Sequence, residues 1–211
     1  FWFKINLFPK PFIGVDSYLE PLGLERKEEL FANWNFPIEV IQNVERYTND
    51  AKVIALVPSA AWEMKRWPLI HWKNLISKFD NEKIILLGGP EDYFLEELEK
   101  NFKEKIINLA GKLSLIESCA IISRSTCCIS ADTGLLHVAD ILGTPGIALM
   151  GPTAFGHTKS KKITTLQVDL SCRPCSKDGR GQCIQKIYQQ CMVEITPEMV
   201  YQCYQQKCII N

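Results

Sequence analysis

The sequence predicts an α/β fold, a Rossmann-like parallel sheet with helices on both faces. Short apolar runs over 53–57, 84–87 and 147–150 alternate with segments of helical periodicity. Uniformly apolar strands of this length are typical of parallel sheets that are covered on both faces. The 211 residues are 46% hydrophobic and carry no net charge, and no 18-residue apolar run occurs. This composition argues against bulk nucleic-acid binding, a transmembrane helix and a secretory signal.

The first strand, over 53–57, leads into the loop Pro58-Ser59-Ala60-Ala61-Trp62 and then into a helix over 68–79 that opens with proline. Lys65 and Arg66 lie in this loop, at the carboxyl end of the strand, where open α/β sheets bind ligands. Two cations at this place would neutralise a diphosphate. The alternative is that they are ordinary solvated surface residues.

A second strand, over 84–87, is followed by Gly88-Gly89-Pro90 and a helix from Pro90 to Lys100. The glycines permit the close approach of a base or ribose, and Glu91 or Asp92 would accept hydrogen bonds from ribose hydroxyls. Plain turn chemistry explains the same residues equally well.

The following elements complete the alternation. A strand is expected over 106–109, and the next helix begins at Ser114, because Ser114-Leu115-Ile116-Glu117 has the form of a capping box. After a further strand that ends before Asp132, a helix reaches Leu142. The last strand is expected over 163–168.

The turn Asp132-Thr133-Gly134 joins a buried strand to that helix, which Gly143-Thr144-Pro145 ends. A helix N-terminus that is opened by small residues suits a phosphate group. Strand 147–150 then runs into the polar loop Gly151-Pro152-Thr153. The alternative is that Asp132 only caps the helix and that His137 is only a core histidine.

Together these motifs resemble glycosyltransferase family 9, the heptosyltransferases of lipopolysaccharide core synthesis in Gram-negative bacteria. The family pattern Lys-x-Trp-Pro stands at 65–68, Asp-(Ser/Thr)-Gly-x-x-His-x-Ala at 132–139, and Gly-Pro-Thr at 151–153. The segment 86–92 looks like the nucleotide-contacting turn of the family. The resemblance covers about residue 52 to the C-terminus.

The resemblance implies that residues 51–211 are the nucleotide-sugar-binding half, the C-terminal half, of a GT-B transferase, with a Cys-rich segment over 172–208. Residues 1–50 would be the tail of a missing N-terminal acceptor domain together with the connection. The aromatic opening Phe1-Trp2-Phe3 would pack on that domain, and a membrane anchor is the alternative. The general base belongs to that domain in the family, and Asp16 lies in no recognisable motif.

The implied reaction is the inverting transfer of heptose from ADP-heptose to a lipopolysaccharide core acceptor, without a required cofactor or divalent metal. The expected location is the cytoplasm. The basic run Lys159-Ser160-Lys161-Lys162 suggests peripheral contact with the inner membrane, or a solvated loop. The alternatives are a GT-B transferase for another nucleotide sugar, a non-catalytic nucleotide-sugar-binding module, and a metal-binding protein.

In this interpretation Lys65 is the catalytic residue, because it stabilises the leaving ADP, and Arg66 is a weaker ligand of the diphosphate. Asp132 would orient a sugar hydroxyl, and Thr153 would close the pocket. His137 would support the turn or touch the sugar. The expected donor site consists of Ser59, Lys65, Arg66, Gly88, Gly89, Glu91, Asp132, Thr133, Gly134, His137 and Thr153.

Nine cysteines form two groups. Cys119, Cys127 and Cys128 lie in predicted core elements and are expected to pack as small apolar residues. The second group has a spacing that suits structural zinc, another metal or redox pairing, with ordinary loop thiols as the alternative. Its candidate ligands are Cys172, Cys175, Cys183 and Cys191, with Cys203 and Cys208 beyond.

Overall fold

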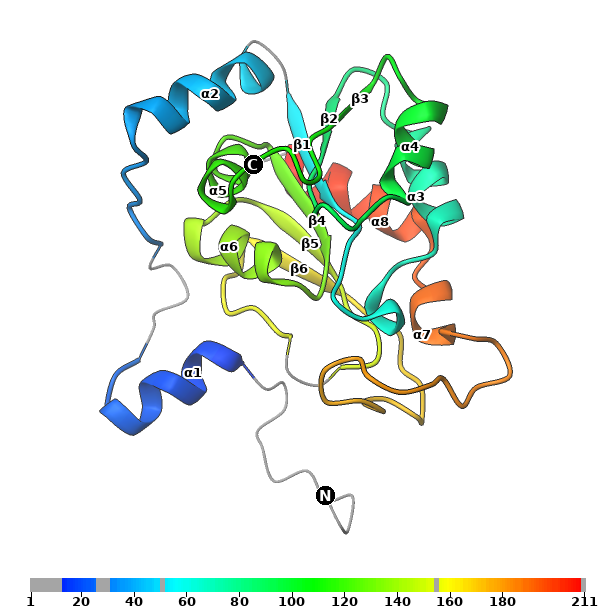
Figure 1. The fold of residues 1–211 in the computed structure, drawn as a ribbon. Coiled ribbons are helices and arrows are strands. Elements are labelled where there is room, and N and C mark those ends of the chain that lie inside the picture. The colour runs from blue at the N-terminus through cyan, green and yellow to red at the C-terminus, as the bar shows by residue number, and fades with distance from the viewer. Residues whose placement is uncertain (1–12, 26–30, 50–51, 154–155, 210–211) are drawn as a thin grey trace.

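The computed structural model describes residues 13–25, 31–49, 52–153 and 156–209. Its centre is a six-stranded parallel sheet with the strand order β3-β2-β1-β4-β5-β6 (Figure 1). The predicted fold class is confirmed. The strands are β1 (Val53–Val57), β2 (Lys83–Leu86), β3 (Ile106–Asn108), β4 (Cys127–Ala131), β5 (Gly146–Leu149) and β6 (Ile163–Leu166).

The strand β1 lies in the middle of the sheet, between β2 and β4. All five of its residues are buried. Ile54 and Leu56 belong to the core on one face, whereas Val53, Ala55 and Val57 belong to the core on the other. This alternation follows from the two-residue period of a strand. Because both faces are covered, the strand is apolar throughout.

One face of the sheet packs against α3, α4 and α8 (Figure 1). The largest side chains on this face are fully buried aromatic rings, and Phe79 and Tyr204 meet edge-to-face with ring centroids 5.0 Å apart. Trp72 packs edge-to-face on Trp67 at the same separation of 5.0 Å. The three helices are α3 (Leu69–Ile76), α4 (Leu95–Asn101) and α8 (Pro197–Tyr204).

The other face is covered by α2, α5 and α6 (Figure 1). The predicted capping box of α5 is present, because the Ser114 hydroxyl accepts from the Glu117 amide and the Glu117 carboxylate accepts from the Ser114 amide. The predicted end of α6 is also confirmed, since Gly143 adopts the left-handed conformation at φ 70°. These helices are α2 (Ile38–Thr48), α5 (Leu115–Ser123) and α6 (Gly134–Leu142).

One difference from the sequence prediction concerns the helix expected from Pro90. The helix α4 begins only at Leu95, and residues 90–94 form turns. The cause is the Asp92 carboxylate, which accepts a hydrogen bond from the Gly89 amide at 2.7 Å and folds the chain back on itself. A similar but smaller difference occurs in α3, which ends at Ile76 rather than at residue 79.

The helix α2 was not predicted, because its sequence is mostly polar. It packs on α5, where Asn43 donates to Glu117 at 3.1 Å. Val40 and Val44, four residues apart, fill the contact with the core. The proposed domain boundary near residue 50 stays a prediction, although α2 shares a core with the sheet that follows it.

The segment before α2 contains α1 (Gly14–Leu19) and the 3-10 turn η1 (Glu20–Leu22). Its contacts with the rest of the molecule include the ion pair of Asp16 with Lys159, at 2.9 Å, and a β-bridge between Ile13 and His157. No described helix is long and apolar enough to cross a membrane. The aromatic opening Phe1-Trp2-Phe3 lies outside the described residues.

The C-terminal region follows β6 through a long loop to the short helix α7 (Gln190–Val193), then α8 and the π-helical turn η3 (Gln205–Ile209). Cys119, Cys127 and Cys128 are buried as predicted. Burial raises the pKa of the Cys128 thiol to about 12, so this side chain packs as a neutral apolar group.

The packing of α2 leads to a stability prediction. Val44 is fully buried, whereas Ile38 on the same helix is 69% exposed. Val44→Ala should lower the free energy of unfolding by about 2 kcal/mol, since it removes buried methyl groups and leaves a cavity. Ile38→Ala is the matched control and should change it by less than about 0.5 kcal/mol. Equal effects in urea denaturation would show that α2 is not part of the folded core.

Candidate functional site

The loop after β1 carries the first part of the site. The 3-10 turn η2 (Glu63–Lys65) places Lys65 next to the turn that follows β4. The Lys65 ammonium lies 3.3 Å from Asp132 Oδ2, and the side chains are only 13% and 11% exposed. Two predicted site residues, 67 positions apart in the chain, therefore form a largely buried ion pair.

Thr153 joins the same carboxylate. Its hydroxyl donates to Asp132 Oδ2 at 2.7 Å, and Thr153 itself is buried. The backbone of Gly156 lies so close to this carboxylate that a Cβ atom there would overlap it. Asp132 is thus held by a cation and a hydroxyl, and a glycine covers it.

The start of α6 is open. Thr133 is its N-cap residue in extended conformation, and no described side chain caps the helix. The Asp132 carboxylate does not cap it because it is engaged with Lys65 and Thr153. Among the described residues, no atom outside the helix backbone and the two chain neighbours lies within 4 Å of where a Cβ of Gly134 would stand. The positive end of the helix thus has room beside Gly134 and no side-chain cap, an arrangement that suits an anion.

Trp67 anchors this loop in the core. Its indole N–H donates to the carbonyl of Ile195 at 2.8 Å, and the ring is buried against Trp72. In the sequence Lys-Arg-Trp-Pro, the tryptophan is therefore an anchor that holds the loop carrying the two cations. Ser59, at the beginning of the same loop, is half-buried and makes none of these contacts.

Arg66 has a different neighbourhood from Lys65. Its Nε donates to the carbonyl of Ala60 at 3.0 Å, and its Nη2 lies 3.8 Å from Asp92 Oδ1. The guanidinium also stands over the Phe94 ring, 5.1 Å from its centroid. Arg66 therefore faces the turn after β2, whereas Lys65 faces the turn after β4.

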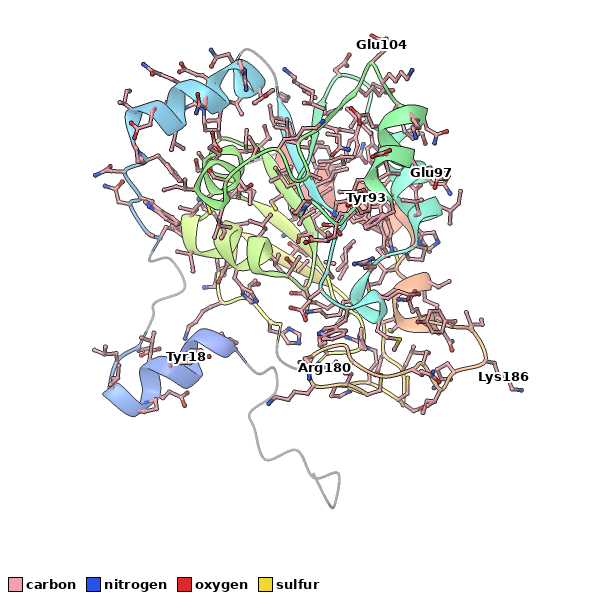
Figure 2. The ribbon with its side chains drawn as sticks, viewed as in Figure 1. Tyr18, Tyr93, Glu97, Glu104, Arg180 and Lys186 are labelled. Carbon is pink, nitrogen blue, oxygen red and sulfur yellow. The ribbon has the colours of Figure 1, made fainter. Side chains whose placement is uncertain are left out.

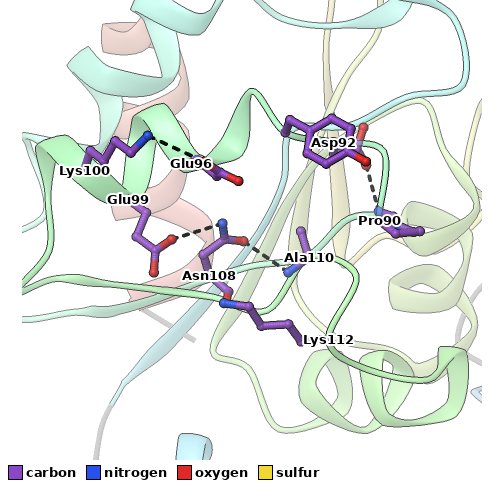
Figure 3. A pocket seen from close by; sticks show the side chains of 10 residues that line it. Pro90, Asp92, Glu96, Glu99, Lys100, Asn108, Ala110 and Lys112 are labelled. Atoms are coloured by element: carbon purple, nitrogen blue, oxygen red, sulfur yellow. Dashed lines mark hydrogen bonds and ion pairs between the residues drawn. The ribbon is translucent and has the colours of Figure 1, made fainter.

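The turn after β2 borders a cavity of about 240 Å³ (Figure 3). Asn108 lines this cavity, and its side chain donates to Glu99 at 3.3 Å and accepts from the Ala110 amide at 3.1 Å. Gly89 lies on the wall, and exposed Glu91 projects from the same turn. The remaining lining residues are Pro90, Asp92, Tyr93, Glu96, Lys100 and Lys112.

The segment after β6 lies over the loop of Lys65. Gly179 packs so closely that a Cβ there would meet Lys65 Cγ at 2.6 Å. Arg180 lies over the Trp62 ring, 4.9 Å from its centroid, and is labelled in Figure 2. Arg173 donates to the carbonyl of Gly151 at 2.7 Å. This segment therefore supports the Gly-Pro-Thr loop and covers the stem of Lys65.

The four cysteines of the predicted metal set are neighbours, since the Cys172, Cys175 and Cys183 thiols all act on the pKa of Cys191. Among the described residues, however, no group of three or more His, Cys, Asp or Glu side chains is arranged to hold a metal ion. The Arg173 guanidinium lies near Cys172, Cys175 and Cys191 and adds a positive charge, which disfavours a cation. Metal binding and redox pairing both stay predictions.

Sequence reasoning did not find Gly156, Arg173 or His157. Burial and the charge of Arg173 lower the pKa of His157, and Asp132 opposes them. Gly156 and His157 follow the Gly-Pro-Thr loop without a motif of their own, and Arg173 lies between Cys172 and Cys175, whose spacing draws attention to the cysteines rather than to the arginine. His137 is half-buried on α6 and is not part of the cluster of Lys65, Asp132 and Thr153.

Fold and site together define an α/β domain in which a cation and an uncapped helix start lie at the carboxyl edge of a parallel sheet, an arrangement that suits an anionic ligand. A family model described as glycosyltransferase family 9 (heptosyltransferase) matches residues 10–188. The chain belongs to this family.

Lipooligosaccharide heptosyltransferase 2 of Haemophilus influenzae is 30% identical over 178 residues, which are 76% of this chain and 49% of that protein. The chain thus spans about half the length of the curated relatives it matches. A family 9 glycosyl transferase of Veillonella parvula superposes with a TM-score of 0.74 at 22% identity, over 98% of this chain and 63% of that one. E. coli ADP-heptose heptosyltransferase II gives 0.67 at 22% identity, over 83% and 53%.

The two glycines beside Asp132 give opposite predictions. Gly156→Ala should lower the free energy of unfolding by about 1–3 kcal/mol, because the new methyl group overlaps the buried carboxylate. Gly134→Ala should leave it unchanged or raise it by up to about 1 kcal/mol, because the methyl group enters free space at a helix start. Chemical denaturation measures both. The packing around Asp132 would be wrongly described if the two variants were equally stable.

Proposed function

We propose that this chain is the donor-binding part of an inverting glycosyltransferase that moves heptose from ADP-heptose to a lipopolysaccharide core acceptor. The observation that carries the proposal is the cluster of Lys65, Asp132 and Thr153 beside the open start of α6. Names of relatives, such as lipooligosaccharide heptosyltransferase 2, give the sugar and the acceptor class.

In this proposal the diphosphate of the donor lies between Lys65 and the first amides of α6. As the bond from the sugar to the β-phosphate breaks, negative charge develops on the leaving ADP. A fixed ammonium and a helix N-terminus stabilise that charge more than they stabilise the intact donor, and this difference lowers the barrier. The chemistry needs no divalent metal, since the cation is already part of the protein.

The ion pair between Lys65 and Asp132 would be replaced by contacts with the donor when the donor binds. Without ligand, the carboxylate neutralises a lysine that is largely removed from solvent. A bound diphosphate offers Lys65 a second anionic partner, and Asp132 is then available to a hydroxyl of the donor sugar. Thr153 holds the carboxylate in place during the change, because its hydrogen bond reaches the same oxygen.

The nucleoside would occupy the cavity beside the turn after β2. Glu91 is exposed on the same turn, next to the lining residues Pro90 and Asp92, and has no hydrogen-bond or ion-pair partner among the described residues, whereas Asp92 is engaged with Gly89 and Arg66. Glu91 is therefore the better acceptor for ribose hydroxyls. The general base is not assigned, and the ion pair of Asp16 with Lys159 argues against Asp16 in that role.

Membrane contact through the basic run receives little support. Lys159 pairs with Asp16, and Lys162 stands over the Phe31 ring at 4.6 Å, so both are committed within the chain. A transferase that uses a nucleotide sugar would work in the cytoplasm, where such donors are made. We therefore propose that location, and we leave contact with the inner membrane to parts of the protein other than this run.

Binding of ADP to the 211-residue chain tests the proposal by calorimetry. Lys65→Ala should weaken ADP binding by about 1.5–3 kcal/mol, as is typical of a charge-assisted contact. The matched control is Lys73→Ala, whose ammonium pairs with Glu97 on the surface of α3 and α4, and which should bind ADP normally.

UDP is the competing ligand in the same assay. Preference for UDP would indicate another nucleotide sugar as the donor. Equal affinity of the Lys65→Ala variant and the unchanged chain for ADP would remove Lys65 from the donor site.

A further inference from the structure

We propose that Arg66 is a positioning residue for the nucleoside, which holds the turn over 88–92 in shape through Asp92, and that it is not a ligand of the diphosphate. This inference rests on the proposed donor site and assigns its two neighbouring cations to different halves of the ligand.

The guanidinium of Arg66 is already occupied on three sides. Nε donates to the Ala60 carbonyl at 3.0 Å, Nη2 approaches Asp92 Oδ1 at 3.8 Å, and the flat face lies on the Phe94 ring. Arginine is suited to this role because its planar group can stack and donate at the same time. To reach a phosphate beside α6, it would have to leave all three contacts.

Asp92 transmits the effect to the turn. Its side chain is 8% exposed, and Oδ2 accepts from the Gly89 amide at 2.7 Å. A Cβ at Gly88 would stand 2.8 Å from the same oxygen, and Glu91 is the residue immediately before Asp92 in the chain. The carboxylate therefore lies folded against both glycines, and the cavity wall at Gly89 and Pro90 depends on it (Figure 3).

A carboxylate this deeply buried needs a counter-charge. Arg66 is the cation that the structure places beside it, and the arginine comes from the neighbouring strand's loop, since β1 and β2 pair directly. Without Arg66, the buried Asp92 carboxylate loses the cation beside it and moves toward solvent. This movement loosens the Gly89 turn, on which the nucleoside would lie.

The local backbone explains why consecutive cations separate. Arg66 has extended dihedrals, φ −77° and ψ 132°, after the 3-10 turn that ends at Lys65. Successive side chains of an extended chain point to opposite sides. Lys65 therefore reaches toward β4 and Asp132, whereas Arg66 reaches toward β2 and Asp92.

The test separates the two halves of ADP by measuring the binding of adenosine, inorganic pyrophosphate and ADP to the full chain. Arg66→Ala should weaken adenosine and ADP binding about tenfold and leave pyrophosphate binding within about twofold, because the turn loses the cation that pairs with Asp92. Lys65→Ala should give the reverse pattern, with pyrophosphate and ADP weakened and adenosine unchanged.

Asp92→Ala is the decisive second variant. If Asp92 positions the turn, it should reproduce the adenosine loss of Arg66→Ala, and the double variant should lose no more than either single one. Removing an acid near a phosphate site would instead strengthen anion binding. Arg66→Lys keeps the charge without the planar group and should recover part of the adenosine affinity. Arg46→Ala, which removes a cation stacked on Tyr47 in α2, is the control.

The outcomes that overturn the inference are distinct from those that overturn the proposed function. Arg66→Ala that weakens pyrophosphate as much as adenosine would make Arg66 a phosphate ligand. Unchanged adenosine binding in Arg66→Ala, or in Asp92→Ala should Arg66→Ala fail to fold, would also reject the inference while ADP binding by the unchanged chain stands. If the unchanged chain binds none of the three ligands, the donor site itself is refuted, and the inference with it.

Discussion

The ion pair between Lys65 and Asp132 is the interaction on which the arrangement of the site depends. Both groups are more than four-fifths removed from solvent, so neither charge would be tolerated there without the other. The pair joins the loop after β1 to the turn after β4, and Thr153 extends it to the loop after β5. Three consecutive strands of the sheet are thus connected at their carboxyl ends by a single carboxylate.

The central place of β1 explains why this loop, and not another, carries the cations. A loop that leaves the middle of a sheet has neighbours on both sides, and here it contacts both, through Asp132 and through Asp92. Trp67 fixes its far end to the chain before α8. The loop is therefore supported from three directions, although it contains little regular structure, and its two cations have fixed places without ligand.

The strands and the helices α3 to α6 could be predicted, because periodicity, glycine stops and the Ser114 capping box act locally, whereas α1, α7 and α8 were not predicted. The helix α2 was missed because its apolar face is only two buried valines wide. The late start of α4 was missed because it depends on where one side chain folds back, which no periodicity records. Within the site, the meeting of Lys65 with Asp132 follows from strand order, but the partner of Arg66 and the approach of Gly156 require coordinates.

The cysteines differ sharply in accessibility, and this has a practical consequence for spectroscopy. Cys119, Cys127 and Cys128 are enclosed in the core, whereas Cys175 is exposed. The amide of Cys175 donates to the carbonyl of Pro152 at 3.1 Å, one residue before Thr153. A fluorophore or spin label coupled to the accessible thiols would therefore sit beside the Gly-Pro-Thr loop, and its signal would report motion of that loop directly.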